Sequence, residues 1–285
     1  MSRFLGPLWM LVFCLFLPLG DTLTRLIREA GIHVTQVIFV EYALITLLLL
    51  PFVNRFGKTG LLDKKIRGWH LLRCVTFFGA ALFWIGVLHL VPLIQLFAIG
   101  FLAPLFASAL SVIFLKETIT IDKLICLLSG LVGTLIIIRP GFVEVSIYLL
   151  IAILSPVCWA FTMVSTKKLT EHTSPSMLLF IMGASTTLLS FPFAVLNWTP
   201  IPSNLVWMVI GIALIGIAVH FALIKAYQHS DITVLAPLEF STLLFASIFS
   251  VVLFKEELLI WTYIGAAFII LSNLYITFRS APKTD

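Results

Sequence analysis

The sequence predicts an all-α polytopic membrane protein whose ten transmembrane helices form two inverted five-helix repeats. Three observations support this prediction. The chain of 285 residues is 61% hydrophobic and only 11% charged, whereas soluble domains carry about a quarter charged residues. Ten apolar segments follow one another, each long enough to cross a hydrocarbon core of about 30 Å. A phrase of 13 residues occurs in the fourth segment and again in the ninth.

Five apolar segments occupy the first half of the chain. The first could be mistaken for a secretory signal peptide because Arg3 precedes it. No small-x-small cleavage motif follows, so we expect a retained helix. The fourth segment ends in the repeated phrase, and the fifth follows it directly. The five segments are 4–22, 33–53, 69–90, 92–115 and 119–138.

Five more apolar segments occupy the second half. Their apolar runs are continuous, unlike the short alternating segments of a membrane β-barrel. The longest loop, 54–68, is too short to hold a soluble domain. We expect a first five-helix repeat over 1–142 and a second over 143–285. The five segments are 145–165, 176–196, 205–225, 233–254 and 258–278.

The positions of Lys and Arg predict the orientation. If the N-terminus is cytoplasmic, the inner loops and ends hold thirteen of the 18 basic residues, and the outer loops hold only Arg25, Arg28, Arg139 and Lys255. This asymmetry fits the positive-inside rule, so both termini should be cytoplasmic. We attribute the net charge of +5 to this topology and expect no nucleic-acid partner.

The repeated phrase predicts two halves of opposite orientation. Residues 105–117 read "LFASALSVIFLKE" and residues 244–256 read "LFASIFSVVLFKE", which agree at 8 of 13 positions. Because the two copies are five helices apart, Lys116-Glu117 and Lys255-Glu256 should face opposite sides of the membrane. Inverted repeats are typical of secondary transporters. We expect each Lys-Glu pair to fix the turn into the next helix.

Small residues recur at every fourth position around the two phrases. Such stripes let helix backbones approach closely within a membrane. We therefore assign a packing role to the following set: Gly100, Ala103, Ala107, Ser111, Thr242, Ala246 and Ser250.

At the level of the whole chain, the sequence resembles a known family. "FLAPLFASALSVIFLKE" followed by "GLVGTLIIIRPG", then "CWAFTMVSTKKL" and "HFALIKAYQHSDITVLAPLEFSTLLFASIFSVVLFKEE", resemble the two halves of an EamA-type transporter of the drug/metabolite transporter superfamily. The resemblance implies ten helices around a central cavity, with the fifth and tenth at the periphery. Sequences with "AP" in both halves are similar to transporters for S-adenosylmethionine, riboflavin and amino-acid-like metabolites.

The resemblance and the inverted repeat together imply a secondary transporter in a bacterial inner membrane. We expect alternating access for a small polar, zwitterionic or cationic metabolite, with proton coupling as one possibility. The expected partners are this metabolite, membrane lipid and a second copy in a homodimer. An exporter of broad specificity is the nearest alternative, and a membrane-embedded enzyme acting on a lipid-linked substrate is a more distant one.

Glu239 is the strongest candidate for a functional residue. Ionisable residues inside a membrane are costly and usually face the bundle interior. Positions 239, 242, 246 and 250 would share one helix face, and the counterpart of Glu239 in the first half is Gly100. Glu239 could contact the substrate or carry a proton; alternatively it pairs with a neighbour such as Lys225.

Seven further residues could line the transport pathway. Glu41 is either a proton site or a counter-charge for a cation, or it pairs with a basic side chain of another helix. His220 and Tyr227 share a helix face; His220 is a packing residue or a proton relay. Arg73 either snorkels to the interface or binds an anion. Gln95, Trp84 and Trp159 could line the cavity, or they could serve packing.

We expect no cofactor and no metal. Cys14, Cys74, Cys126 and Cys158 all fall inside apolar segments and share no metal-ligand spacing. The "GKT" at 57–59 lacks the glycine of a phosphate-binding loop. No catalytic motif is present, so we expect a protein that is not an enzyme.

Overall fold

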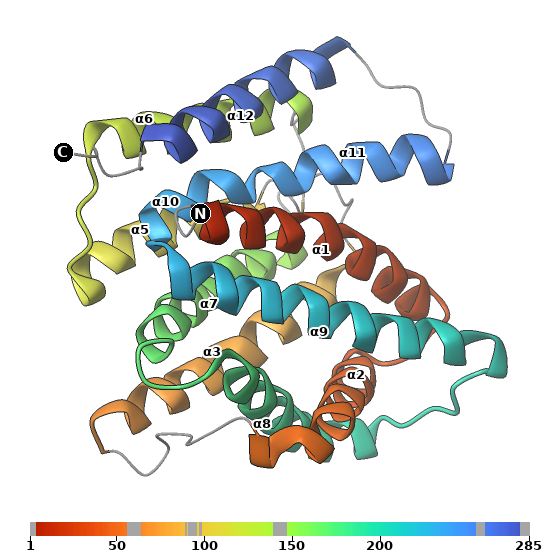
Figure 1. Ribbon diagram of the computed structural model, residues 1–285. Coiled ribbons are helices and arrows are strands. Elements are labelled where there is room, and N and C mark those ends of the chain that lie inside the picture. The colour runs from red at the N-terminus through yellow and green to blue at the C-terminus, as the bar shows by residue number, and fades with distance from the viewer. Residues whose placement is uncertain are drawn as a thin grey trace.

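The computed structural model describes residues 4–55, 64–88, 90, 96, 99–138, 147–254 and 260–279. All regular structure in these ranges is helical (Figure 1). The first half forms α1 (Leu5–Glu29), α2 (Val34–Leu49), η2 (Leu50–Arg55), α3 (Lys64–Val87), α5 (Leu102–Leu115) and α6 (Ile121–Ile138). The second half forms α7 (Ile147–Leu169), α8 (Pro175–Leu196), η3 (Ser203–Leu205), α9 (Val206–His229), α10 (Ile232–Glu239), α11 (Ser241–Phe254) and α12 (Ile260–Arg279).

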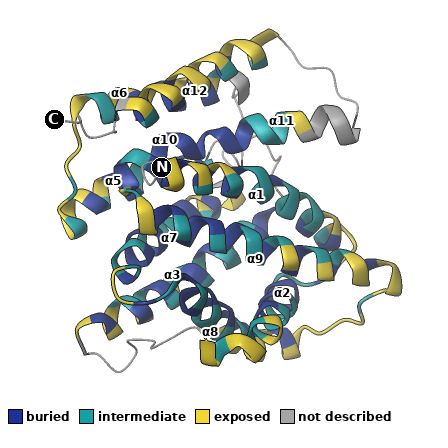
Figure 2. Ribbon diagram, viewed as in Figure 1, coloured by how far each residue is buried: buried dark blue, intermediate teal, exposed yellow. Residues whose placement is uncertain are grey.

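The chain is a multi-pass integral membrane protein. Each of the ten expected segments contains helix, and seven helices in the described ranges are long and apolar enough to cross a membrane. Many large apolar side chains on their outer faces are exposed, as expected where lipid replaces water. Buried residues gather instead on the helices at the centre of the bundle (Figure 2). The count of ten spans stays a prediction.

Two of the expected segments differ from the observed helices in ways that affect the site. The first helix does not end at Thr22 but continues to Glu29. Thr22 donates a hydrogen bond to the carbonyl of Pro18 at 2.8 Å, and an Arg25–Glu29 ion pair supports the last turn. The ninth segment is not one helix, because it breaks at Phe240 between α10 and α11. Pro237 lies just before the break and cannot donate a backbone hydrogen bond.

Four helix pairs dominate the packing. Helix α1 lies along α9, α3 along α7, α2 along α8 and α6 along α12. In addition, α5 packs on α7 and α11 packs on α1. The α6–α12 pair lies along one side of the bundle, away from α2, α3 and α8 (Figure 1).

Glycine makes the close α6–α12 contact possible. A Cβ atom on Gly133 of α6 would lie 2.7 Å from the carbonyl oxygen of Gly265 and 2.9 Å from Cβ of Phe268, both on α12. Ser272 of α12 also donates a hydrogen bond to the carbonyl of Cys126 at 2.7 Å. Helix α6 therefore packs directly against the backbone of α12.

Polar side chains fasten the turn between α9 and α10. The Glu117 carboxylate accepts hydrogen bonds from the backbone N–H groups of Ile232 (3.1 Å) and Thr233 (3.0 Å). The ammonium of Lys123 donates to Thr233 Oγ1 at 2.8 Å. We call Glu117, Lys123 and Lys167 the loop clamp. A carboxylate at a helix N-terminus satisfies unpaired N–H groups and the helix dipole.

Lys167, at the end of α7, holds the same turn from the other side. Its ammonium donates to the carbonyls of Tyr227 (3.0 Å) and Ser230 (2.8 Å) and lies 3.6 Å from the carboxylate of Asp231. The loop clamp thus joins the end of α5, the start of α6 and the end of α7 to the α9–α10 turn.

The expectation that the first Lys-Glu pair acts on its own turn holds in part only. Lys116 ends α5 with φ of 59°, but Glu117 caps a helix of the other half.

Candidate functional site

A cavity lies among helices of both halves. Its walls come from α1, α2, α3, the start of α5, α7, α9 and the α10–α11 break. The lining residues sit around the middle of α1, α2, α7 and α9 and in the later part of α3. The cavity is therefore displaced from the loop clamp. Between the cavity and the clamp lies a buried apolar cluster that includes Met10, Leu223, Tyr227 and Leu235.

Glu239 reaches the cavity from the end of α10 and is only 6% exposed. Its carboxylate accepts a hydrogen bond from the hydroxyl of Tyr227 at 3.4 Å. Lys225 is not its partner: the Lys225 ammonium donates to Gln228 at 3.1 Å and lies over the ring of Phe221. The structure therefore excludes this pairing, because Lys225 and Tyr227 point from different faces of α9. Tyr227 is fully buried behind the cavity wall.

Glu41 of α2 also lines the cavity. Among the described residues, no basic side chain lies within ion-pair distance of its carboxylate, so the expected alternative of a basic partner is not met there. Gly216 of α9 provides the space, because a Cβ atom there would lie 3.0 Å from Glu41 Oε1. One turn further along α9, His220 Nε2 and the hydroxyl of Tyr42 are 3.1 Å apart and hydrogen-bonded. His220 is thus both a packing residue and a cavity residue.

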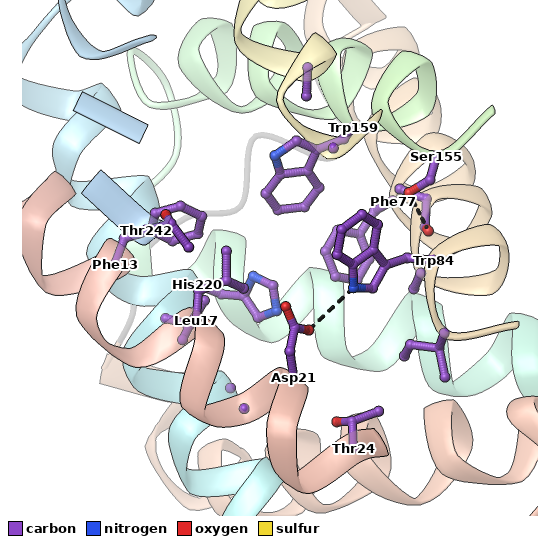
Figure 3. A pocket seen from close by; sticks show the side chains of 18 of the residues that line it. Phe13, Leu17, Asp21, Thr24, Phe77, Trp84, Ser155, Trp159, His220 and Thr242 are labelled. Carbon is purple, nitrogen blue, oxygen red and sulfur yellow. Dashed lines mark hydrogen bonds between the residues drawn. The ribbon is translucent and has the colours of Figure 1, made fainter. Parts of the chain in front are cut away.

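The structure adds Asp21, which our sequence interpretation missed. Asp21 lies in α1, lines the cavity and accepts a hydrogen bond from the indole N–H of Trp84 at 3.3 Å. Figure 3 shows its carboxylate pointing from α1 toward the Trp84 ring. The expected first helix ends at Thr22, and an acid next to the end of a membrane helix does not indicate a site inside the membrane. The Arg25–Glu29 spacing of i,i+4 was the available signal that the helix continues.

Aromatic rings form much of the remaining wall. Trp84 and Trp159 both line the cavity, together with Phe77 (Figure 3). The ring centroids of Phe77 and Trp159 lie 6.1 Å apart. Gly100 and Ala103, expected to serve packing, lie on the cavity wall as well. A Cβ atom on Gly100 would come within 3.0 Å of the Trp84 ring, so this glycine makes room for the indole.

Arg73 neither snorkels nor lines the cavity, which corrects the sequence expectation. It is 2% exposed and lies in the middle of three helices. Its Nε donates to Thr166 Oγ1 of α7 at 2.8 Å, and Nη1 donates to the carbonyl of Leu178 of α8 at 3.0 Å. These bonds direct the guanidinium into the protein and away from the membrane interface.

The other members of the small-residue set lie as follows. Ala107 and Ser111 of α5 are buried, and Ala107 shares an apolar cluster with Ala160 of α7. Thr242 is buried and lines the cavity beside Glu239, whereas Ala246 is half-buried outside it. The side chain of Ser250 and the whole of Gln95 and of Lys255-Glu256 lie outside the described residues.

The cavity wall carries three carboxylates, from Asp21, Glu41 and Glu239, and no Lys or Arg among its described lining residues. The described part of the chain also holds no group of three His, Cys, Asp or Glu side chains placed to bind a metal ion. This wall is acidic and aromatic, which suits a positively charged organic molecule.

Comparison with known proteins identifies the family. The model of the EamA-like transporter family matches residues 4–139 and again residues 146–278. The chain belongs to the EamA-like transporter family. The resemblance seen in the sequence is therefore confirmed.

Named relatives of this EamA-like transporter are transporters of metabolites. A riboflavin transporter of Vibrio cholerae is 27% identical over 95% of this chain and 92% of its own length. S-adenosylmethionine uptake transporters of Rickettsia prowazekii and Rickettsia bellii are 26% and 28% identical, each over 96% of this chain and 92% and 94% of their own lengths. A solved crystal structure has the same fold, with a TM-score of 0.79 and 17% identity over 98% of this chain and 96% of that one.

Proposed function

We propose that this protein is a secondary transporter that moves a positively charged or zwitterionic metabolite across a bacterial inner membrane by alternating access. The cavity supports this proposal most strongly. It is built from both halves, carries three carboxylates, and is separated from the loop clamp by a buried apolar cluster. Substrate sites of such transporters lie near the bilayer midplane at the interface of the repeats.

The pairing of the helices supports an inverted repeat. The α1–α9 pair exchanges with the α7–α3 pair, and the α5–α7 pair exchanges with the α11–α1 pair. The α2–α8 and α6–α12 pairs exchange with themselves. Two repeats with the same contacts in opposite orientation give inward-open and outward-open states of similar energy. We place the boundary between the repeats at residues 142 and 143.

The distribution of Lys and Arg supports cytoplasmic termini, which puts the loop clamp on the cytoplasmic side. In this orientation the cavity lies on the periplasmic side of the clamp, and the clamp closes the inner gate. The inward-open state then requires that Glu117, Lys123 and Lys167 release the α9–α10 turn.

The charge of the wall supports the choice of substrate. Three carboxylates, with no Lys or Arg among the described lining residues, repel anions and attract cations. Of the two substrates named for relatives, S-adenosylmethionine carries a sulfonium and an ammonium group, whereas riboflavin is neutral. We therefore propose an S-adenosylmethionine-like substrate. Glu239, hydrogen-bonded to Tyr227, is the group that we assign to proton coupling.

Export is the second candidate for the direction of transport. A relative named as a pseudopaline exporter of Pseudomonas aeruginosa is 24% identical over 76% of this chain and 77% of its own length. The cavity itself suits either direction.

Flux into proteoliposomes tests the proposed function. Purified protein should exchange external labelled S-adenosylmethionine for unlabelled S-adenosylmethionine inside, and excess unlabelled riboflavin should compete weakly. Reversing the pH gradient should reverse net flux. Folded protein that exchanges no organic cation or zwitterion would contradict the proposal.

A further inference from the structure

The walls formed by α1, α2 and α3 contain two carboxylates, Asp21 and Glu41, that have no role in the proton coupling assigned to Glu239. We propose that Asp21 and Glu41, with the indole of Trp84, form a cation subsite that binds the positively charged centre of the substrate. This inference rests on the proposed function, because it assumes that the cavity is the substrate site. It assigns the substrate charge to the first half and leaves Glu239 of the second half for the proton.

Glu41 is the strongest indication of a ligand. Its side chain is 8% exposed, it lines the cavity, and among the described residues it has neither a hydrogen-bond nor an ion-pair partner. A buried carboxylate without partners is expensive, because its lost hydration is not replaced. A cation in the cavity would supply the missing partner.

Asp21 supports the same cation from the neighbouring helix. It lines the same cavity as Glu41, and the helices that carry the two acids, α1 and α2, are in contact. Its carboxylate accepts a hydrogen bond from the indole N–H of Trp84, with Nε1 3.3 Å from Oδ1, and this bond sets the direction of the carboxylate (Figure 3). Two acids that face one cavity repel each other unless a positive charge lies between them or one is protonated.

Trp84 indicates an organic cation and not a hard metal ion. A metal ion such as Ca²⁺ takes six to eight oxygen ligands, which two carboxylates and an indole do not supply. A sulfonium or substituted ammonium is stabilised by carboxylates and by the face of an indole together. Gly100 and Gly216 preserve the space at this subsite, since Cβ atoms there would lie 3.0 Å from Trp84 and from Glu41.

The second half provides the contrast. Glu239 already accepts a hydrogen bond from Tyr227, and it enters the cavity from the α10–α11 break. Glu239 therefore has a fixed partner, Tyr227, whose hydrogen bond can change when Glu239 takes up a proton. Asp21, Glu41 and Trp84 belong to α1, α2 and α3 of the first half.

The test measures binding of two matched ligand pairs to purified full-length protein at pH 8. S-adenosylmethionine and S-adenosylhomocysteine differ by one methyl group and the sulfonium charge. N-methyl-4-phenylpyridinium and 4-phenylpyridine differ in the same way on a flat aromatic body. Equilibrium dialysis gives the four dissociation constants for wild type, Asp21→Asn, Glu41→Gln and Trp84→Phe. Glu29→Gln is the control, because it removes a carboxylate from an exposed ion pair of the same helix.

We expect wild type and Glu29→Gln to bind the charged member of at least one pair about tenfold or more tightly than its neutral partner. Asp21→Asn and Glu41→Gln should each lose most of this preference, because removing one member of a buried charge pair weakens binding at least tenfold. Trp84→Phe should keep the preference in part, since a phenyl ring replaces the indole and the hydrogen bond to Asp21 is lost. If an acid variant does not fold, Trp84→Phe still tests the subsite.

Three results would overturn the subsite: equal binding of charged and neutral partners by wild type, an undiminished preference in both acid variants, or no binding of either charged probe by folded wild type. Competition by NaCl but not by KCl would overturn it as well, because the site would then hold an inorganic ion. Charge-selective binding without any flux in proteoliposomes would contradict the proposed function and leave the subsite standing. Flux without charge-selective binding would contradict the subsite and leave the proposed function standing.

Discussion

At the scale of single residues, the carboxylates of the cavity differ in what holds them. Glu239 accepts a hydrogen bond from Tyr227, Asp21 accepts one from Trp84, and Glu41 has no partner among the described side chains. Buried charges are stable only when they are paired or hydrogen-bonded. The three acids are therefore suited to different tasks in the same cavity.

Replacing Glu239 by Gln should abolish accumulation driven by a pH gradient and preserve exchange of substrate for substrate. The amide keeps the shape and the hydrogen bond to Tyr227 but carries no exchangeable proton. Counterflow and gradient-driven uptake, measured on the same proteoliposomes, separate the two activities. Normal gradient-driven accumulation in Glu239→Gln would show that the coupling group lies elsewhere.

Arg73 should matter for stability and not for substrate binding. Arg73→Met keeps the long apolar stem but removes two hydrogen bonds that join α3 to α7 and α8. We expect the free energy of unfolding to fall by about 2–4 kcal/mol, because Thr166 Oγ1 and the Leu178 carbonyl each lose the hydrogen bond donated by Arg73. Thermal unfolding in detergent measures the effect.

Arg67→Met is the matched control, because Arg67 is exposed on the same helix. It should change the unfolding temperature little. If both variants unfold at the same temperature, or if Arg73→Met weakens substrate affinity in a stable protein, the structural role assigned to Arg73 is wrong.

At the scale of helices, sequence patterns predicted where the apolar segments lie. They did not predict that the first helix continues beyond its apolar segment or that the ninth segment breaks into two helices. Continuous apolar runs identify membrane helices, because the bilayer demands about 20 such residues. The extension of α1 beyond Thr22 was missed, since "DTLTRLIRE" is polar, and Asp21 was missed with it. Pro237, which lies inside α10, was the nearest local signal of an irregularity in the ninth segment, but it does not predict a break at Phe240. The capping of α10 by Glu117 joins positions 115 residues apart and leaves no local pattern.

The α6–α12 contact should be sensitive to a single methyl group. Gly133→Ala places a Cβ atom 2.7 Å from a backbone oxygen of α12, which a side-chain rotation cannot relieve. The helices must separate, at a cost of about 1–3 kcal/mol. Gly86→Ala in α3 is the control, because a Cβ atom there has no neighbouring heavy atom within 4 Å.

Fluorescence-detected size exclusion gives the folded yield of both variants, and thermal unfolding gives their stability. We expect Gly133→Ala to be less stable than wild type and Gly86→Ala to be unchanged or slightly more stable, since Ala favours helix over Gly. Equal stability of the two variants would mean that α6 and α12 do not pack through their backbones at this point.

At the scale of the whole molecule, a central cavity lies next to an end of the bundle that is closed by the loop clamp. The cavity is lined by both halves, and the loop clamp holds the α9–α10 turn through five hydrogen bonds from Glu117, Lys123 and Lys167. If the clamp is the closed inner gate, transport requires it to open in every cycle. The family and the general fold could be read from the sequence, whereas this gate depends on contacts between distant segments.

Cross-linking the clamp tests the central claim most directly. Glu117→Cys and Thr233→Cys, in a functional background without the four native cysteines, are joined by a short bismaleimide. Lys225→Cys with Gln228→Cys is the control, because this pair lies on one helix and its cross-link restrains no gate. We predict that flux of labelled S-adenosylmethionine stops only in the cross-linked gate variant, while its binding from the periplasmic side persists. Undiminished flux through the cross-linked gate would contradict the alternating-access account.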